Sequence, residues 1–205
     1  MKLVLMQFVS LDGVSQGPGG PEEDPSGGFT RGGWFTPFVD AAFLQTVVKW
    51  MEAADAFLFG RQTYEAFAKH WPTVTNPDDV VARKLNGAPK YVVSQKNLRV
   101  ASWQPATILS ADIPAQVAQL KRQRGREIQI HGSARLAYSL IGAGLVDEVR
   151  LVVAPVVVGQ GRKLFPDGGL PLGFNLLSHD TTPAGLAIHV YQSAGTPKFA
   201  TYSAA

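Results

Sequence analysis

The chain has 205 residues, 45% hydrophobic and 17% charged, and this length and composition are typical of one globular domain, residues 1–205. Its net charge of +3 is too small and too scattered to predict nucleic-acid binding, and the absence of cysteine excludes disulfides, thiol catalysis and cysteine-based zinc sites. The four histidines lack metal-ligand spacing, no apolar run approaches transmembrane length, and the N-terminus does not resemble a signal peptide. We therefore expect a cytoplasmic protein with no metal and no membrane or nucleic-acid partner.

The first part of the chain predicts a strand followed by a long loop. Lys2–Val9 has the apolar character of a buried strand, which the turn Ser10-Leu11-Asp12-Gly13 ends. Residues 12–37 are too rich in Gly and Pro for regular structure. Because this stretch also contains Phe29, Trp34 and Phe35, we interpret it as an ordered lid beside a site rather than as a disordered linker.

The rest of the chain alternates between strand and helix patterns until a final pair of strands. Strands are predicted at Asp55–Phe59, Lys90–Ser94, Thr107–Leu109, Glu127–Ile130 and Glu148–Pro155. Helices are predicted at Pro37–Ala53, Thr63–Trp71, Asn76–Asn86, Asp112 to about Arg124, and Ser133 to about Ile141. Two alternating runs around Thr181–Gly185 predict an antiparallel hairpin. The fold class is therefore α/β, with a mixed, mostly parallel sheet flanked by helices on both faces.

Two strand–turn–helix junctions carry the most specific chemical signal. Gly60-Arg61-Gln62-Thr63 follows one buried strand, and His131-Gly132-Ser133 follows another. In each, a glycine lets a ligand approach the backbone and the helix start offers free amides to a phosphate. Either junction alone could be an ordinary capped turn, with Thr63 or Ser133 as the cap. Two of them at the ends of buried strands favour a dinucleotide.

The other motifs are less informative about function. Gly159-Gln160-Gly161 lacks the third glycine and the helix of a dinucleotide-binding fingerprint. Asp12 could form a turn with its own backbone, or it could orient or protonate a substrate beneath the lid. Trp34 and Phe35 are the lid aromatics that we expect to stack on a substrate.

Taken together, these residues resemble the dihydrofolate reductase-like superfamily. The resemblance is closer to its pyrimidine reductase branch, which includes the C-terminal reductase domain of the bifunctional riboflavin-biosynthesis protein. It covers Leu3 to about Gln192 and depends on the order and spacing of several short motifs. These are SLDG, a Gly/Pro-rich loop ending in GGW, FGRQTYE, YVVS, HGSARL and VVVGQGRKLFP.

The resemblance implies a three-layer α/β/α sandwich and an NADPH cofactor. It assigns Gly60, Arg61, Gln62 and Thr63, helped by Ser94, to the pyrophosphate and adenosine 2′-phosphate side, and Arg61 to the preference for NADPH over NADH. It also assigns His131, Gly132, Ser133, Ala134 and Leu136 to a second pyrophosphate turn, and Ser15 and Gln16 to the neighbourhood of the nicotinamide. Relatives in the superfamily are commonly homodimers, so a homodimer is expected.

The half of the site that binds folate in dihydrofolate reductases does not match. Counting along the motifs places Leu44 at the position of the pteridine-binding acid, Val153 at that of its supporting threonine, and Ala88 at that of the arginine that binds the glutamate. The nearest acid, Asp40, lies one helical turn away from Leu44. An apolar replacement cannot perform the work of a buried carboxylate or a guanidinium.

The expected function is therefore NADPH-dependent reduction of a small heterocyclic or ribosylamino-pyrimidine substrate, as in 5-amino-6-(5-phosphoribosylamino)uracil reductase. The basic residues nearest to a phosphate of such a substrate are Arg31, Arg162 and Lys163. Two alternatives stay open at this point. One is a dihydrofolate or pterin reductase that uses Asp40, and the other is a catalytically silent, nucleotide-binding homodimer module.

Overall fold

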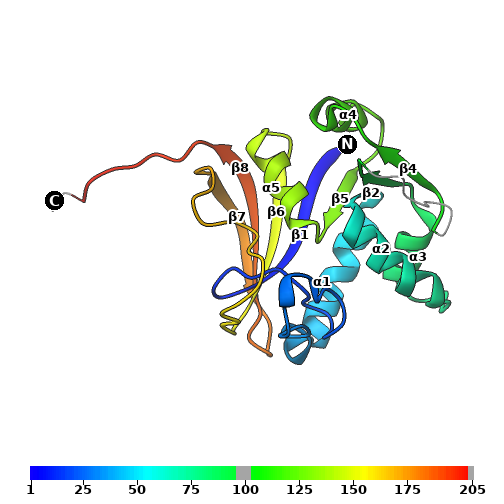
Figure 1. Ribbon diagram of the computed structural model, residues 1–205, viewed down its shortest axis with the longest axis horizontal. Coiled ribbons are helices and arrows are strands. Elements are labelled where there is room, and N and C mark those ends of the chain that lie inside the picture. Colours follow the sequence, from blue (N-terminus) through cyan, green and yellow to red (C-terminus); the bar gives the residue numbers. More distant parts are fainter. Residues whose placement is uncertain (96–102, 203–205) are drawn as a thin grey trace.

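A computed structural model describes residues 1–95 and 103–202. Its centre is an eight-stranded sheet with the strand order β4-β3-β2-β5-β1-β6-β8-β7, which crosses the middle of the molecule (Figure 1). The strands are β1 (Lys2–Ser10), β2 (Ala54–Gly60), β3 (Lys90–Val93), β4 (Ala106–Leu109), β5 (Glu127–His131), β6 (Glu148–Ala154), β7 (Gly173–Thr181) and β8 (Ala187–Gly195).

The sheet is parallel over most of its width. The neighbours from β4 to β6 all pair in parallel, whereas β8 pairs antiparallel with both β6 and β7. The predicted C-terminal hairpin is therefore confirmed, and so is the mixed, mostly parallel sheet. Because all parallel strands end at the same edge, the loops after β1, β2, β5 and β6 lie along one edge of the sheet.

In the described ranges, five α-helices cover the two faces of the sheet. They are α1 (Ala41–Glu52), α2 (Arg61–His70), α3 (Val80–Gly87), α4 (Ile113–Lys121) and α5 (Ala134–Gly142). One buried cluster joins α1, α2 and α3 to the sheet, and a second joins α4 and α5 to it. Successive strand residues point to opposite faces, so in β1 Leu3 and Leu5 enter the second cluster while Phe8 packs against the first. This is the predicted three-layer sandwich.

Two helices begin later than the sequence pattern predicts. The helix expected from Pro37 begins at Ala41, because the side chain of Asp40 accepts a hydrogen bond from the Phe43 N–H at 2.8 Å. The helix expected from Asn76 begins at Val80, where Asp79 accepts from the Ala82 N–H at 2.9 Å. Each aspartate satisfies an amide that has no partner within the helix and so defines where the helix starts.

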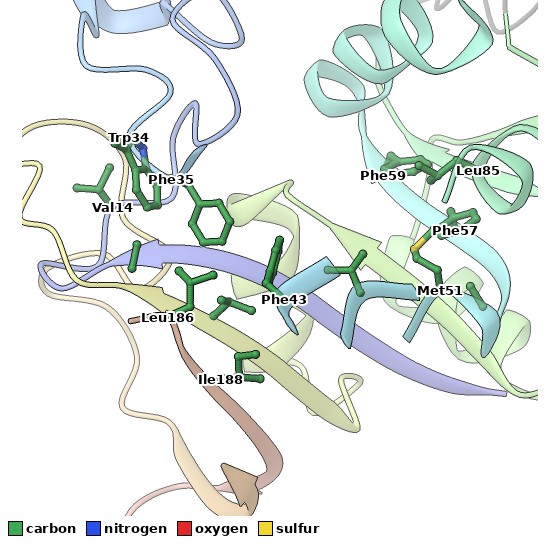
Figure 2. Close-up of a cluster of buried hydrophobic side chains, with 14 of the residues drawn as sticks. Val14, Trp34, Phe35, Phe43, Met51, Phe57, Phe59, Leu85, Leu186 and Ile188 are labelled. Carbon is green, nitrogen blue, oxygen red and sulfur yellow. The ribbon is translucent and has the colours of Figure 1, made fainter. Parts of the chain in front are cut away.

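The lid is ordered and packs against the α1 side of the sheet. It contains two short 3-10 turns, Ser26–Gly28 and Thr36–Phe38. Figure 2 shows Trp34 and Phe35 directed into the same cluster as Phe43 of α1 and Ile188 of β8. The lid is thus part of the hydrophobic core, which explains how a stretch so rich in glycine and proline stays in place.

Candidate functional site

The two predicted junctions lie side by side. Gly60 ends β2 and caps α2, while Ser133 follows β5 and caps α5. Since β2 and β5 are hydrogen-bonded neighbours in a parallel sheet, the N-termini of α2 and α5 come together at the carboxyl edge. Residues 70 positions apart in the sequence therefore form one site, as the dinucleotide interpretation requires.

The junctions are also joined by direct hydrogen bonds. The Gly60 N–H donates to Ser133 Oγ at 2.9 Å, and the Ser133 N–H donates to Thr63 Oγ1 at 3.1 Å. Gly132 and Ser133 both have left-handed backbones, with φ of 57° and 53°. A Cβ on Gly132 would lie 3.2 Å from Thr63 Cγ2, so this position needs glycine for space as well as for conformation.

This arrangement is suited to binding an anion. Each helix presents the positive end of its dipole and amides without partners in the helix. The hydroxyls of Ser133 and Thr63 accept bonds from backbone amides, which leaves each hydroxyl proton available for donation to a ligand. Arg61 lies in the first turn of α2, where it forms an ion pair with Glu65 at 2.9 Å.

Arg135 is a further cation that sequence reasoning missed. It is exposed and is the second residue of α5, whereas Arg61 is the first residue of α2. The signal was available in the motif HGSAR, where a cation lies two residues after the cap residue Ser133. Together Arg61 and Arg135 place one cation on each of the two helix starts.

The other residues predicted for the cofactor lie along the same edge. Ser94 directly follows β3, the neighbour of β2, and its N–H donates to the Leu109 carbonyl at 3.0 Å. Gln62 is exposed in the first turn of α2, and Ala134 and Leu136 are half-buried in the first turn of α5. All of these residues thus lie at, or directly beyond, the carboxyl ends of β2, β3 and β5.

His131 contributes its backbone to the junction, whereas its imidazole belongs to the core. The ring is buried, packs edge-on against Phe57 and lies 3.0 Å from Gln129 Oε1. Burial, with the nearby positive charge of Arg150, lowers the pKa of His131 to about 3. The imidazole is therefore neutral at physiological pH and acts as an anchor for the turn that follows it.

Ser15 and Gln16 connect the lid to the loop after β6. The N–H of Ser15 donates to the Arg162 carbonyl at 2.8 Å. The Gln16 amide donates to the carbonyls of Asp24 and Ser26, at 3.0 and 2.8 Å, and accepts from the Arg162 N–H at 3.0 Å. With these bonds made inside the protein, the side chain of Gln16 holds the lid in shape.

Asp12 fastens the end of β1 to the same loop. Its carboxylate accepts bonds from Ser10 Oγ at 2.6 Å, the Val158 N–H at 3.0 Å and the Gly159 N–H at 2.7 Å. The Ser10 hydroxyl, followed by these two amides, lowers the pKa of Asp12 to about 2, against the opposing effect of burial. A carboxylate that is ionised and occupied in this way has no proton to deliver at neutral pH, so the observed geometry favours the role of an anchor.

The packing of Trp34 and Phe35 does not support the prediction that they stack on a substrate. Phe35 is 2% exposed and stacks on Phe8, with ring centroids 4.4 Å apart. The Trp34 ring is buried as well, and its indole N–H donates to the Gln16 carbonyl at 2.8 Å. Both rings are covered by the protein itself because the lid needs an apolar underside to pack against the sheet.

Asp40 is likewise occupied by the protein. Besides capping α1, its carboxylate accepts a bond from the Ala184 N–H in the turn between β7 and β8, at 2.9 Å. These two amide bonds, that of Phe43 first, lower the pKa of Asp40. A carboxylate used in this way is poorly placed to grip a pterin ring, which requires both of its oxygens.

The structure also corrects one step of the comparison with folate enzymes. Val153 packs in the cluster of α4 and α5, so it cannot face a residue of α1. The two β6 residues that flank Val153, namely Val152 and Ala154, face the α1 side. Neither side chain can donate a hydrogen bond, and Leu44 on α1 is 52% exposed. The comparison with folate enzymes therefore concerns Val152 or Ala154, rather than Val153, as the β6 neighbour of α1.

One surface cavity lies away from this site. A cavity of about 570 Å³ lies between the end of α5, the segment before β7 and the end of β8, and it contains none of the predicted site residues. Within the described ranges, no group of three or more His, Asp or Glu side chains is arranged to hold a metal ion. None of the helices in those ranges has the length and apolar character needed to cross a membrane.

The sheet order, the two helix layers and the paired junctions define a protein of the dihydrofolate reductase-like fold. Among solved structures, dihydrofolate reductase from Enterococcus faecalis complexed with NADP(H) matches with a TM-score of 0.58 and 12% identity, over 94% of this chain and 96% of that one. A putative riboflavin biosynthesis protein from Shewanella sp. PV-4 matches with a TM-score of 0.66 and 19% identity, over 95% of this chain and 99% of that one.

The sequence comparisons identify the family. The chain belongs to the RibD C-terminal domain family, whose family model matches residues 1–188. It is also 28% identical over 200 residues to the uncharacterized protein YyaP of Bacillus subtilis, which covers 95% of this chain and 96% of that protein. The family is one of riboflavin-pathway reductases, which supports assignment of the chain as an oxidoreductase.

Proposed function

We propose that this protein is an NADPH-dependent reductase that transfers a hydride to a small heterocyclic or ribosylamino-pyrimidine substrate. The observation that carries the proposal is the direct hydrogen bonding between the junctions at Gly60 and Ser133. It joins two helix N-termini into one cradle, and a pyrophosphate has two phosphoryl groups to fill it. The family and the fold support the same class of cofactor.

The residues at the cradle fit this cofactor. Glycine at position 132 lets the turn pack against Thr63, because a Cβ there would lie 3.2 Å from Thr63 Cγ2. The hydroxyls of Thr63 and Ser133 can donate to the oxygens of a phosphate. Arg61 would hold the adenosine 2′-phosphate, and Arg135 would add a second cation at the start of α5. Bound NADPH would supply the hydride.

The chain itself would contribute position and shielding. The lid, fastened by Gln16 and Asp12, would close one side of the carboxyl edge and limit the access of water. We propose that the proton for the reduced substrate comes from water, because the pKa of about 2 leaves Asp12 ionised and its oxygens occupied. With the proton supplied by water, the main contribution of the protein would be to orient NADPH and the substrate.

The test is to replace Arg61 by Ala and to measure the binding of NADPH and NADH by fluorescence titration. If Arg61 holds the 2′-phosphate, its loss weakens NADPH binding by at least tenfold, equivalent to about 1.4 kcal/mol, and leaves NADH binding nearly unchanged. Glu65→Gln is the matched control, because it frees Arg61 from its ion pair. That variant should bind NADPH more tightly. Equal losses for both cofactors in Arg61→Ala would exclude the 2′-phosphate assignment.

A further inference from the structure

The substrate side of the site is formed by two loops that the structure brings together. The Leu11 N–H donates to the Val156 carbonyl at 2.8 Å, and Val14 forms an antiparallel bridge with Lys163. Residues 11–40, the lid and its surroundings, thus share one surface with residues 155–168 after β6. We call these two segments the substrate loops. Because β1 lies between β5 and β6, this surface adjoins the cofactor junctions, and its use by substrate depends on the function proposed above.

The substrate loops are acidic although the chain as a whole is basic. They contain six carboxylates and three cations, a formal net charge of −3, against +3 for the entire chain. The carboxylates are Asp12, Glu22, Glu23, Asp24, Asp40 and Asp167, and the cations are Arg31, Arg162 and Lys163. The cofactor side shows the reverse character, since it gathers two helix N-termini with Arg61 and Arg135.

The three cations of the substrate loops are engaged within the loops themselves. The Arg162 guanidinium forms an ion pair with Asp24 and donates to Ser26 Oγ at 2.8 Å. Arg31 donates to the Val158 carbonyl. Lys163 contacts Asp167 at 3.1 Å, an exposed pair that holds its partner only weakly. These are the residues that a ribose phosphate would need, and a phosphate would have to displace their present partners.

Apolar side chains are exposed on the same surface. Leu11 and Val157 lie at the contact between the loops after β1 and β6 and are 64% and 67% exposed. Leu44 in the first turn of α1 is 52% exposed. The start of α1 is joined to the turn between β7 and β8 by the Asp40 bond to Ala184. That turn touches the loop after β6, because a Cβ on Gly185 would lie 3.4 Å from Pro155 Cγ. The exposed apolar residues thus follow a connected line of contacts around the substrate side.

We propose that the substrate of this reductase is an uncharged heterocycle without a phosphate group, held by apolar contacts with the substrate loops. A surplus of three negative charges repels a phosphate dianion, and at separations near 10 Å in water this repulsion lowers affinity by about tenfold at low salt. An uncharged heterocycle avoids this repulsion and gains from covering Leu11, Leu44 and Val157. The site therefore selects by shape and apolar contact rather than by a phosphate clamp.

The experiment is a calorimetric titration of the NADPH-loaded protein with a ribosylamino-pyrimidine and with its 5′-phosphate, at 20 and 300 mM NaCl. We expect the form without phosphate to bind at least as tightly, and the affinity of the phosphorylated form to stay constant or to improve as salt rises. The proposal would be overturned if the 5′-phosphate bound tenfold more tightly than the form without phosphate, bound more weakly at 300 mM than at 20 mM NaCl, and lost its binding in Arg162→Ala. The initial NADPH titration reports on the proposed function separately.

A second titration tests the charge argument without depending on the heterocycle. Inorganic phosphate is added to the NADPH-loaded protein, and we expect no saturable binding up to 10 mM. A dissociation constant above 10 mM corresponds to a binding free energy weaker than roughly 3 kcal/mol. Saturable binding that Lys163→Ala abolishes would overturn the proposal.

A pair of charge variants completes the test. Glu22→Gln with Asp167→Asn removes two exposed carboxylates from the substrate loops, and Glu52→Gln with Asp78→Asn removes two exposed carboxylates elsewhere. We expect the first pair to raise the affinity for the 5′-phosphate several-fold at 20 mM NaCl, and the second to leave it unchanged. Equal effects of both pairs would show that the local charge of the substrate loops does not discriminate against phosphate.

Discussion

The hydrogen bonds between the two junctions predict a specific effect of replacing Ser133. In Ser133→Ala the Gly60 N–H loses its acceptor at 2.9 Å. Leaving a partly buried amide without a partner costs about 1–3 kcal/mol of folding free energy. The left-handed backbone at Ser133, with φ of 53°, is as unfavourable for alanine as for serine. The loss should therefore come from the hydrogen bond alone.

Two further variants separate the hydrogen bond from the backbone strain. Ser133→Gly loses the same acceptor, but glycine adopts a positive φ without penalty, so it should recover about 1 kcal/mol relative to Ser133→Ala. Thr63→Val removes the acceptor of the Ser133 N–H at 3.1 Å, and Thr63→Ser keeps it. Because the two hydroxyls support the same contact, Thr63→Val and Ser133→Ala together should cost less than the sum of the single variants, by at least about 0.5 kcal/mol.

The assay is urea unfolding of each variant, followed by titration with NADPH. We expect Ser133→Ala to lower both the free energy of unfolding and the NADPH affinity, the latter by about tenfold for one lost donor. The control Thr63→Ser should retain both. An unfolding free energy for Ser133→Ala within about 0.3 kcal/mol of the wild type, with unchanged NADPH affinity, would refute the reasoning.

The buried side chains of His131 and Lys90 make the free energy of unfolding depend on pH, the first at acid pH and the second at alkaline pH. The pKa of His131 is lowered to about 3 in the folded chain, so the unfolded chain binds the extra proton first and stability falls as the pH drops from 6.5 towards 3, by at most about 1.4 kcal/mol per pH unit. His131→Asn should flatten this acid limb in unfolding experiments, and an unaltered slope would contradict the buried, neutral imidazole. Burial likewise lowers the pKa of Lys90 from 10.5 to about 8, so stability should rise with pH between these two values. Lys90→Met should abolish that alkaline rise, and its persistence would assign the rise to another group.

The fold could be predicted largely from local pattern. Buried parallel strands, such as Lys2–Val9 and Glu148–Pro155, give apolar runs of strand length that are bounded by turn residues, and these runs were found within one or two residues of their observed ends. The helices were harder to delimit, because a helix begins where a cap satisfies its first amides. Asp40 and Asp79 fulfil that role in the structure, but the periodicity of neighbouring apolar residues extended beyond both.

The sequence could predict the backbone turns of the candidate site but not the direction of its side chains. The glycine turns at Gly60 and Gly132 are local features, and strand order then brings them together. Side-chain direction is a tertiary property, which is why Trp34 and Phe35 were expected at a ligand and lie in the core. Their aromatic character signalled an ordered lid correctly, but it could not show which side of the lid they occupy. The same limit applies to Val153, whose face depends on the register of β6.

The buried polar residues of β5 fix the orientation in which the chain enters the turn at Gly132 and Ser133. Glu127 forms an ion pair with Arg150 at 2.6 Å and accepts a bond from the Gln129 amide at 2.7 Å. Gln129 also donates to the Trp50 carbonyl at 2.6 Å and holds the His131 ring. Each group fixes the next, so the chain enters Gly132 in a single orientation.

From the other side, the same turn is held by the hydroxyls of Ser133 and Thr63. Two consecutive residues with positive φ would otherwise be among the least stable parts of the loop, because a left-handed backbone is unfavourable for serine. Held between the β5 side chains and α2, the turn has little conformational freedom left to lose when a phosphate binds. Preorganisation of this kind raises affinity without requiring further contacts. If the cradle binds a phosphate as proposed, the backbone amides would be its main ligands, and the side chains of Ser133 and Thr63 would serve chiefly to hold them in place.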